Sequence, residues 1–260
     1  GILFWSIHLA VSDGKLGILD RLAAGDTLIF DGATGTYLQN NGLEPGGSPE
    51  LMNASNPDVI KGMAKHYFDA GSDIVLTNTF GGNKFMLERY GAGDRLFELN
   101  RLAAEHARSV APEGKFVSGS IGPTGEFIEP LGTATEDELY DTFAEMCKAF
   151  EVGGADAVMI ETQLAIEEAA IAVRAAKENT GLVVMATMVF DKGPRGYFTM
   201  MGVTPEQAVE GLEEAGADVV GTNCGNGIER MVEIATRMRA ATDIYLVVQS
   251  NAGLPIIKKG

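Results

Sequence analysis

Six polar residues stand where apolar, strand-like runs of the chain give way to loops, and their side chains could carry chemistry. They comprise two carboxylates, one thiol and three amides: Asp31, Glu161, Cys224, Asn78, Asn223 and Asn251. A carboxylate at the exit of a buried strand is unusual, because an unpaired buried charge is costly. A thiol in such a place can become a nucleophile or a metal ligand once it loses its proton. We therefore expect a binding or catalytic site at these strand ends.

Asp31 precedes the small residues Gly32 to Gly35, whose backbone N–H groups could face an anion. An amino acid needs both features, because N–H donors bind its carboxylate and an acidic group binds its ammonium. The alternative is that Asp31 only caps the turn that follows it. The residues alone leave both interpretations open.

Glu161 has a comparable alternative, in which it places a negative charge beside the N-terminus of the next predicted helix. The glycine-rich run from Gly119 to Gly125 could hold a phosphate, although Pro123 removes one backbone donor. Such a run is a weak signal by itself. A turn of the fold or a loop over a substrate explains it at least as well.

Cys224 could be a nucleophile, a metal ligand or a small buried residue, and the last is the commonest fate of a lone cysteine. Cys147, in the middle of a predicted helix, is interpreted as packing. Two cysteines make no disulfide framework, so we expect a reducing, cytoplasmic location. The three histidines lie in the N-terminal segment and in predicted helices: His8, His66 and His106. A Cys–His catalytic pair is therefore not indicated.

Alternating strands and helices must position these residues. The sequence predicts seven apolar strands, at 27–30, 73–76, 115–118, 157–160, 182–188, 219–220 and 244–248. It predicts helices between them, at 56–70, 84–110, 135–152, 164–179, 204–215 and 228–241. Continuous apolar strands indicate a parallel sheet that is buried on both faces. The carboxyl ends of such strands meet at one rim, where the polar residues would gather.

A weak internal repeat supports this organisation. In segments 70–78, 154–161 and 215–223 a helix ends at a glycine, an aspartate turns the chain, and an apolar strand ends at a polar residue. Seven strands are one short of a closed (β/α)8 barrel. We therefore predict an α/β fold, a TIM barrel truncated before its eighth strand, over residues 16–260. Residues 1–15 are a separate extension of unclear role, whose apolar part is too short to span a bilayer.

The composition narrows the choice of partners. The 260 residues carry a net charge of −16, which argues against nucleic acid and against an anionic membrane. A small polar ligand or a protein partner is the more natural expectation.

Six short motifs, taken together, are more specific than any single residue. They are Asp31-Gly-Ala-Thr-Gly-Thr36, Leu76-Thr-Asn-Thr-Phe80, Gly122-Pro-Thr-Gly125, Ile160-Glu-Thr162, Gly221-Thr-Asn-Cys224 and Asn251-Ala-Gly-Leu-Pro255. In their order and types they resemble the homocysteine S-methyltransferase family over about Leu16 to Gly260. The resemblance is closest to the homocysteine-binding domain of cobalamin-dependent methionine synthase.

The resemblance implies a (β/α)8 barrel that binds zinc through three cysteine thiolates. Cys224 matches the first ligand, and the other two belong to a Gly-Gly-Cys-Cys motif that is expected beyond Gly260. Asp31 and Glu161 would hold the ammonium of homocysteine, and the backbone of Gly32 and Ala33 its carboxylate. The remaining residues that the resemblance places at the substrate are the amides Asn78, Asn223 and Asn251.

Three functions follow as hypotheses. The first is a methyltransferase of methionine biosynthesis, which transfers a methyl group from a methylcorrinoid to the zinc-activated thiol of homocysteine. Methylcobalamin, methyltetrahydrofolate by way of a corrinoid, S-methylmethionine and betaine all serve relatives as donors, and a corrinoid protein or domain is a possible partner. We expect the 260-residue form itself to be inactive, because Cys224 alone supplies one ligand.

The second hypothesis is an inactive amino-acid-binding module that lacks the zinc site. The third is a barrel enzyme of another class, such as an aldolase or a phosphate-sugar isomerase. No lysine stands at a predicted strand end for Schiff-base chemistry, which leaves this third hypothesis with the least support.

Overall fold

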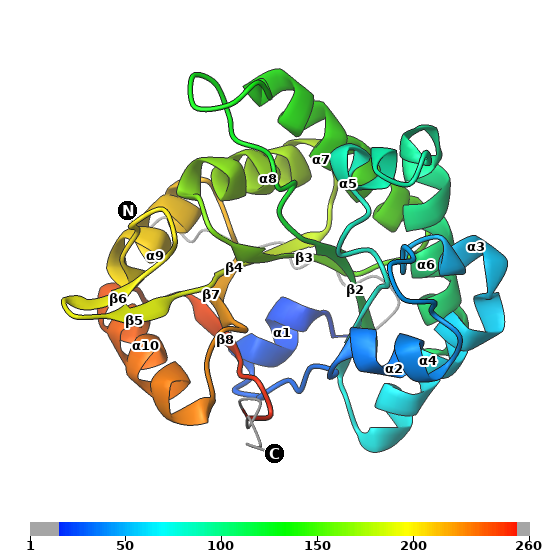
Figure 1. Cartoon of the computed structure of the whole chain (residues 1–260). Coiled ribbons are helices and arrows are strands. Elements are labelled where there is room, and N and C mark those ends of the chain that lie inside the picture. The colour runs from blue at the N-terminus through cyan, green and yellow to red at the C-terminus, as the bar shows by residue number, and fades with distance from the viewer. Residues whose placement is uncertain (1–15, 254–260) are drawn as a thin grey trace, which may run out of the picture.

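The computed structural model describes residues 16–253, and its centre is a curled parallel sheet of six strands (Figure 1). In spatial order the strands are β1 (Ile74–Leu76), β2 (Phe116–Ile121), β3 (Ala157–Gln163), β4 (Val183–Met188), β7 (Val219–Asn223) and β8 (Tyr245–Gln249). Neighbouring strands follow one another in the chain with helices between them. The predicted α/β architecture and the incomplete barrel are therefore confirmed.

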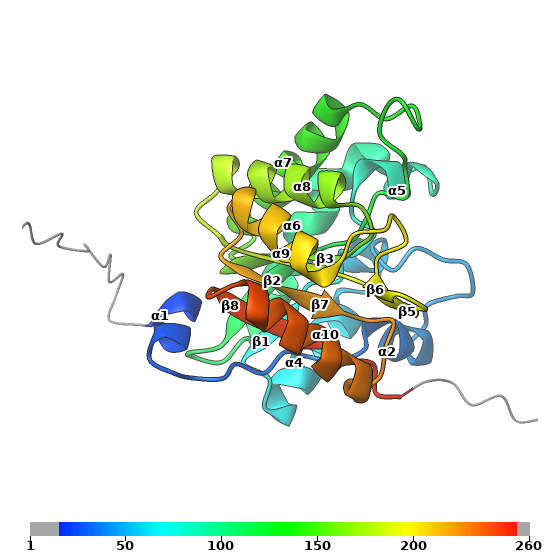
Figure 2. The ribbon, with the colours of Figure 1, turned by 90° about the vertical axis from the view of Figure 1, so that its left-hand side faces the viewer.

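Six long helices cover the outside of the sheet (Figures 1 and 2). They are α4 (Pro57–Ala70), α6 (Leu96–Val110), α7 (Glu136–Val152), α8 (Ile166–Asn179), α9 (Pro205–Glu214) and α10 (Ile228–Ala241). A capping box begins α7, because Glu138 N donates to Thr135 Oγ1 and Thr135 N donates to Glu138 Oε2.

Short helices lie at the two ends of the sheet. Figure 2 shows α1 (Ile18–Ala23) at one end and α2 (Thr34–Asn40) and α5 (Lys84–Glu88) toward the other. Helix α3 (Met52–Ser55) precedes α4. The strands of the sheet run from the end occupied by α1 toward the end occupied by α2, so their carboxyl ends lie near α2.

The first predicted strand takes its place beside β1 but forms only one bridge, between Phe30 and Ile74. The backbone around it still pairs, because Ile74 N donates to Ile29 O and Asp31 N donates to Ile74 O. On the far side, within the described residues, this segment forms no ladder with β8. A cavity of about 590 Å³ lies between the two, lined by residues of both segments and by Ile18 of α1.

One local prediction was wrong, and one element was missed. The helical region predicted at 84–110 is split into α5, a 3₁₀ turn (Gly93–Arg95) and α6. Gly91 explains the break, since its φ of 65° is left-handed and ends a helix. The sequence also did not indicate the hairpin of β5 (Asp191–Gly193) and β6 (Gly196–Phe198), which projects beside α10 in Figure 1.

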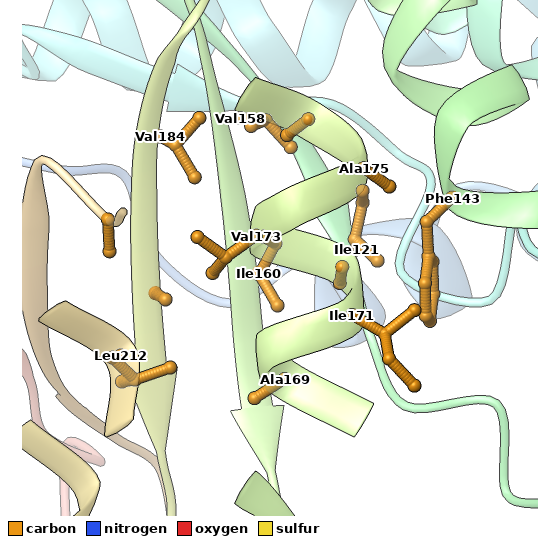
Figure 3. Close-up of a cluster of buried hydrophobic side chains, with 14 of the residues drawn as sticks. Ile121, Phe143, Val158, Ile160, Ala169, Ile171, Val173, Ala175, Val184 and Leu212 are labelled. Carbon is orange, nitrogen blue, oxygen red and sulfur yellow. The ribbon is translucent and has the colours of Figure 1, made fainter. Parts of the chain in front are cut away.

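The core consists of two layers on the two faces of the sheet. The outer layer packs strand residues such as Val158, Ile160 and Val184 against side chains of α7 and α8, among them Phe143 and Val173 (Figure 3). The inner layer lies inside the curl near α1 and contains Ile18, Ile74, Phe116, Ala157, Met159, Met185, Val219 and Val247. Because both faces are covered, the strands are apolar without alternation, as predicted.

Candidate functional site

The inward-facing side chains change from apolar to polar along each strand. In β3, Ala157 and Met159 belong to the inner core, and Glu161 follows them on the same face. In β7, Val219 belongs to that core, and Asn223 lies four residues further on the same face. A cavity of about 670 Å³ opens at this polar end. The fold therefore places a ligand-sized site at the carboxyl ends of the strands, where such barrels bind ligands.

All eight residues that the sequence analysis placed at a site line this one cavity: Asp31, Gly32, Ala33, Asn78, Glu161, Asn223, Cys224 and Asn251. The structure thus brings together segments that are far apart in the sequence. Their individual roles toward a ligand stay predictions.

Glu161 is held at both carboxylate oxygens. Ser120 Oγ donates to Oε1 over 2.6 Å, and Asn223 Nδ2 donates to Oε2 over 3.2 Å. Burial raises the pKa of Glu161, and the hydrogen bond from Ser120 opposes that rise. The alternative role of Glu161, as a charge at a helix N-terminus, is not what the structure shows, because Glu161 lies within β3 and α8 begins at Ile166.

Asp31 lies beside β1 and accepts the backbone N–H of Leu76 at Oδ2 over 2.8 Å. Burial raises the pKa of Asp31 to about 8, and the nearby charge of Glu161 adds to the rise. The turn that follows is held in place by Tyr67, whose hydroxyl donates to Ala33 O over 2.8 Å. Two strand-end carboxylates with raised pKa values therefore share one cavity, as expected of a site that binds a cation.

Asn223 connects the carboxylate to the thiol. Its Oδ1 accepts the backbone N–H of Thr162 and the hydroxyl of Thr187, which fixes the orientation of the amide. Its Nδ2 then lies within hydrogen-bonding distance of Glu161 Oε2 and, at 3.3 Å, of Cys224 Sγ. One buried amide thus sets the separation between the carboxylate of β3 and the sulfur at the end of β7.

Thr162 and Cys224 both adopt left-handed backbone conformations, with φ of 60° and 56°. Residues other than glycine rarely do so, and such strain is concentrated at functional sites. Asn226 supports the strained turn after β7, because its Nδ2 donates to Phe190 O over 2.6 Å and its backbone N–H donates to Cys224 O.

The thiol of Cys224 is half-buried at the cavity. Burial raises its pKa, hydrogen bonds from Thr162 and Asn223 oppose the rise, and the charge of Glu161 adds to it. Across residues 16–253, no three side chains of His, Cys, Asp or Glu form a group that could hold a metal ion.

The two other predicted amides contact the protein more than the cavity. Asn78 Nδ2 donates to Pro49 O and to Asn53 Oδ1, so both of its hydrogens are already used. Its side-chain oxygen, Oδ1, is the atom left to bind a ligand. Asn251 is exposed, and its backbone N–H donates to Asn226 O.

Further polar residues of the cavity were not named as site residues by the sequence analysis, among them Ser120, Thr162 and Glu50. Ser120 lies on the same face of β2 as Phe116, so strand alternation could have found it had the predicted strand not ended at 118. Glu50 is buried in a loop, where it accepts the hydroxyl of Ser48 and the N–H of Gly81. No sequence signal marks it.

The competing sequence interpretations are weaker in the structure. Thr124 N in the glycine-rich run donates to Glu168 Oε1 over 2.7 Å, so a carboxylate already occupies that donor of the suggested phosphate loop. Cys147 is fully buried, as predicted. Neither His66 nor His106 lines the cavity, and His8 lies outside the described residues.

Comparison with known proteins gives one family. The sequence model described as Homocysteine S-methyltransferase matches residues 28–260. The chain is 32% identical over 257 residues to methionine synthase of Mycobacterium leprae (strain TN), which covers 92% of this chain and 21% of that protein. It is 32% identical over 242 residues to betaine–homocysteine S-methyltransferase 1 of Danio rerio, which covers 90% of this chain and 58% of the relative. The chain thus spans about a fifth of the length of the methionine synthases it matches.

The fold is also that of a solved enzyme. The structure superposes with a TM-score of 0.77 on the metallated form of the homocysteine methyltransferase MmuM from Escherichia coli, at 19% identity, covering 90% of this chain and 87% of that one. Within the described residues, every helix is too short or too polar to traverse a bilayer.

Proposed function

Since the chain belongs to the homocysteine S-methyltransferase family, we propose that it binds homocysteine and presents the homocysteine thiol for methylation to methionine. The observation that carries the proposal is the carboxylate pair Asp31 and Glu161, which shares one cavity with the half-buried thiol of Cys224. The proposed setting is the cytoplasm.

The ammonium of homocysteine would lie between Asp31 and Glu161. Both carboxyl groups have raised pKa values in the empty cavity, so an incoming cation stabilises their ionised forms. The backbone N–H groups of Gly32 and Ala33 would receive the substrate carboxylate at the opening of the cavity. With both ends of the amino acid held, the side chain extends toward the end of β7 and its sulfur toward Cys224.

Zinc would make the substrate thiol a nucleophile by favouring its thiolate. The described residues do not fit a complete zinc site, since an open catalytic site takes three protein ligands and Cys224 is the one thiol at the cavity. We propose Cys224 as one ligand and two cysteines beyond Gly260 as the others. The proposed methyl donor is a methylcorrinoid carried by a partner protein or domain, by likeness to the methionine synthases.

The alternative function is an inactive module that binds homocysteine without metal. It is favoured by one observation, that among the described residues no second thiol and no imidazole line the cavity. For this 260-residue chain we expect zinc well below one equivalent after dialysis, because one thiolate does not offset the cost of dehydrating the ion. Metal analysis checks this, and stoichiometric zinc that persists in Cys224→Ser would mean that Cys224 is not a ligand.

Calorimetry with homocysteine under reducing conditions tests the binding proposal. Glu161→Gln should weaken binding by about 2–4 kcal/mol, because the substrate ammonium loses a desolvated anionic partner. The matched control is Glu168→Gln, a buried glutamate of α8 that does not line the cavity and whose change should leave affinity within about threefold. Equal affinity of wild type and Glu161→Gln would refute the assignment of Glu161.

A further inference from the structure

We infer that the cavity recognises its ligand through the ammonium group and accepts aminothiols that have no carboxylate. This inference rests on the proposed function and narrows it to a chemical class. It follows from the charges of the cavity wall together with the neutral groups that are left to bind a carboxylate.

The ionisable groups that line the cavity all belong to acids. They are the carboxyl groups of Asp31, Glu50 and Glu161 and the thiol of Cys224. Among residues 16–253, no lysine, arginine or histidine lines the cavity. A protein that depends on a ligand carboxylate commonly pairs it with an arginine, which makes two parallel hydrogen bonds. Within the part of the chain that the structure describes, a ligand cation therefore meets several acidic partners, while a ligand anion meets no basic side chain.

Glu50 adds to this excess of acidic over basic groups at the cavity, although it is far from β3 in the sequence. Only 5% of Glu50 is exposed, and both its carboxylate oxygens accept neutral donors, Ser48 Oγ at 2.7 Å and Gly81 N at 2.8 Å. These donors hold the carboxylate in place without cancelling its charge. Its field therefore adds to that of Asp31 and Glu161 once a ligand cation favours their ionised forms.

A ligand carboxylate has only neutral donors available. These are the backbone N–H groups of Gly32 to Gly35, at the start of a helix of seven residues. Such donors offset part of the desolvation of a carboxylate, but the carboxylate group of Glu50 in the cavity wall repels it. The two effects oppose each other, so removing the ligand carboxylate should cost little. Removing the ammonium removes the cation that favours the ionised forms of Asp31 and Glu161, and with it their ion pairs to the ligand.

The test compares three ligands on the wild-type chain by calorimetry. Homocysteine carries both charged groups, 3-aminopropane-1-thiol lacks the carboxylate, and 4-mercaptobutanoate lacks the amine. We expect the dissociation constant of the aminothiol to lie within about tenfold of that of homocysteine. The mercapto acid should bind at least about 100-fold more weakly than homocysteine. An aminothiol that binds more than tenfold weaker than homocysteine overturns the inference, as does a mercapto acid that binds as tightly as the aminothiol.

The outcomes separate the inference from the proposed function. If homocysteine binds and the aminothiol does not, the proposed function stands and the inference fails. If only the aminothiol binds, recognition through the ammonium stands and homocysteine is the wrong substrate. If none of the three ligands binds, both fail.

A variant gives an independent check on the role of charge. Glu50→Gln retains an acceptor for Gly81 N and removes one negative charge from the wall. It should improve the affinity of homocysteine relative to that of the aminothiol by about threefold or more. An unchanged ratio in a folded variant would contradict the role assigned to Glu50.

Discussion

The carboxyl groups of Asp31 and Glu161 show how function and stability oppose each other at single residues. Each is desolvated, and no arginine or lysine among the described residues of the cavity lining compensates its charge when it is ionised. A polar group that folding strips of water and leaves partly unpaired costs stability. Such a cost is expected where a ligand, and not the protein, provides the missing partner.

Asp31 should therefore make stability depend on pH. Burial raises its pKa from 3.8 to about 8, so between these values the folded protein holds a proton that the unfolded chain has lost. The free energy of unfolding then falls as the pH rises from about 4 to about 8. Glu161, whose pKa is also raised, acts in the same direction.

We expect Asp31→Asn to flatten this profile and to raise the free energy of unfolding at pH 8 by on the order of 2–5 kcal/mol. Urea unfolding at pH 5 and pH 8 measures both effects. Asp191→Asn, at an exposed residue of β5, is the control and should leave the profile unchanged. If Asp31→Asn is no more stable than wild type at pH 8, Asp31 does not bear the cost assigned to it.

Ser120 should act as a positioning residue for Glu161, and Ser118 on the same strand provides a matched control. Both serines are buried and point inward, but Ser120 Oγ donates to Glu161 while Ser118 Oγ has no hydrogen-bond partner among the described residues. Ser120→Ala should weaken homocysteine binding by about 1–2 kcal/mol, and Ser118→Ala should leave it unchanged. Ser120→Thr, which keeps the hydroxyl, should restore part of the loss.

Calorimetry on the three serine variants checks this ordering. The effect of Ser120→Ala should also largely disappear in the Glu161→Gln background, where the carboxylate is gone. Equal effects of the alanine changes at 118 and 120 would reduce the role of Ser120 to packing.

At the scale of the elements, an aspartate before each of three strands joins that strand to its neighbour by hydrogen bonds. Asp73, Asp156 and Asp218 each accept, at Oδ2, the backbone N–H of one residue of the preceding strand. Each aspartate also donates its own backbone N–H to the carbonyl oxygen of that same residue. Each also pairs with a cation, among them Lys115 for Asp73 and Lys177 for Asp218. These hydrogen bonds and ion pairs explain why an aspartate recurs before the strand in each segment of the sequence repeat.

Loss of one such aspartate should destabilise the fold. Asp218→Ala removes the acceptor of Val184 N, which donates over 2.8 Å in a partly buried place, and should cost about 1–3 kcal/mol. Asp243 stands before β8 but is exposed and forms no hydrogen bond or ion pair within the described part of the chain, so Asp243→Ala should change stability by less than about 0.5 kcal/mol. Urea unfolding compares the two, and similar losses would show that the aspartates act only through strand-start propensity.

At the scale of the whole molecule, the sheet presents two edges that do not pair with each other in the described residues. β8 is bonded to β7 alone, and the segment around Phe30 is bonded to β1 alone. Tyr245 and Val248 of β8 are 37% and 41% exposed. Free edges with apolar side chains favour association with another chain.

We expect this 260-residue chain to self-associate through the β8 edge. Val248→Lys places a charge on that edge and should shift the chain toward monomer, as gatekeeper charges do. Val232→Lys is the control, because Val232 is 56% exposed on α10 and lies away from the edge strand. Sedimentation at several concentrations measures the shift, and an equal response of both variants would attribute association to general charge and not to the edge.

Much of the molecule follows from sequence alone. Continuous apolar runs, and the three repeated segments in which a helix ends at a glycine and a strand ends at a polar residue, predict the parallel sheet and the end at which the site lies, because these are local preferences of the backbone. Six of the seven predicted strands form ladders, and the eight predicted site residues line one cavity.

What only the tertiary structure decided is how side chains meet across strands. Ser120 and Asn223 bind the two oxygens of Glu161 from segments about 40 and 60 residues away, and Glu50 enters the cavity wall from a loop with no distinguishing pattern. The raised pKa values of Asp31 and Glu161 likewise arise from burial, which no residue possesses by itself. Contacts of this kind depend on how the sheet curls, since the curl determines which inward side chains share a cavity and which groups lose their water.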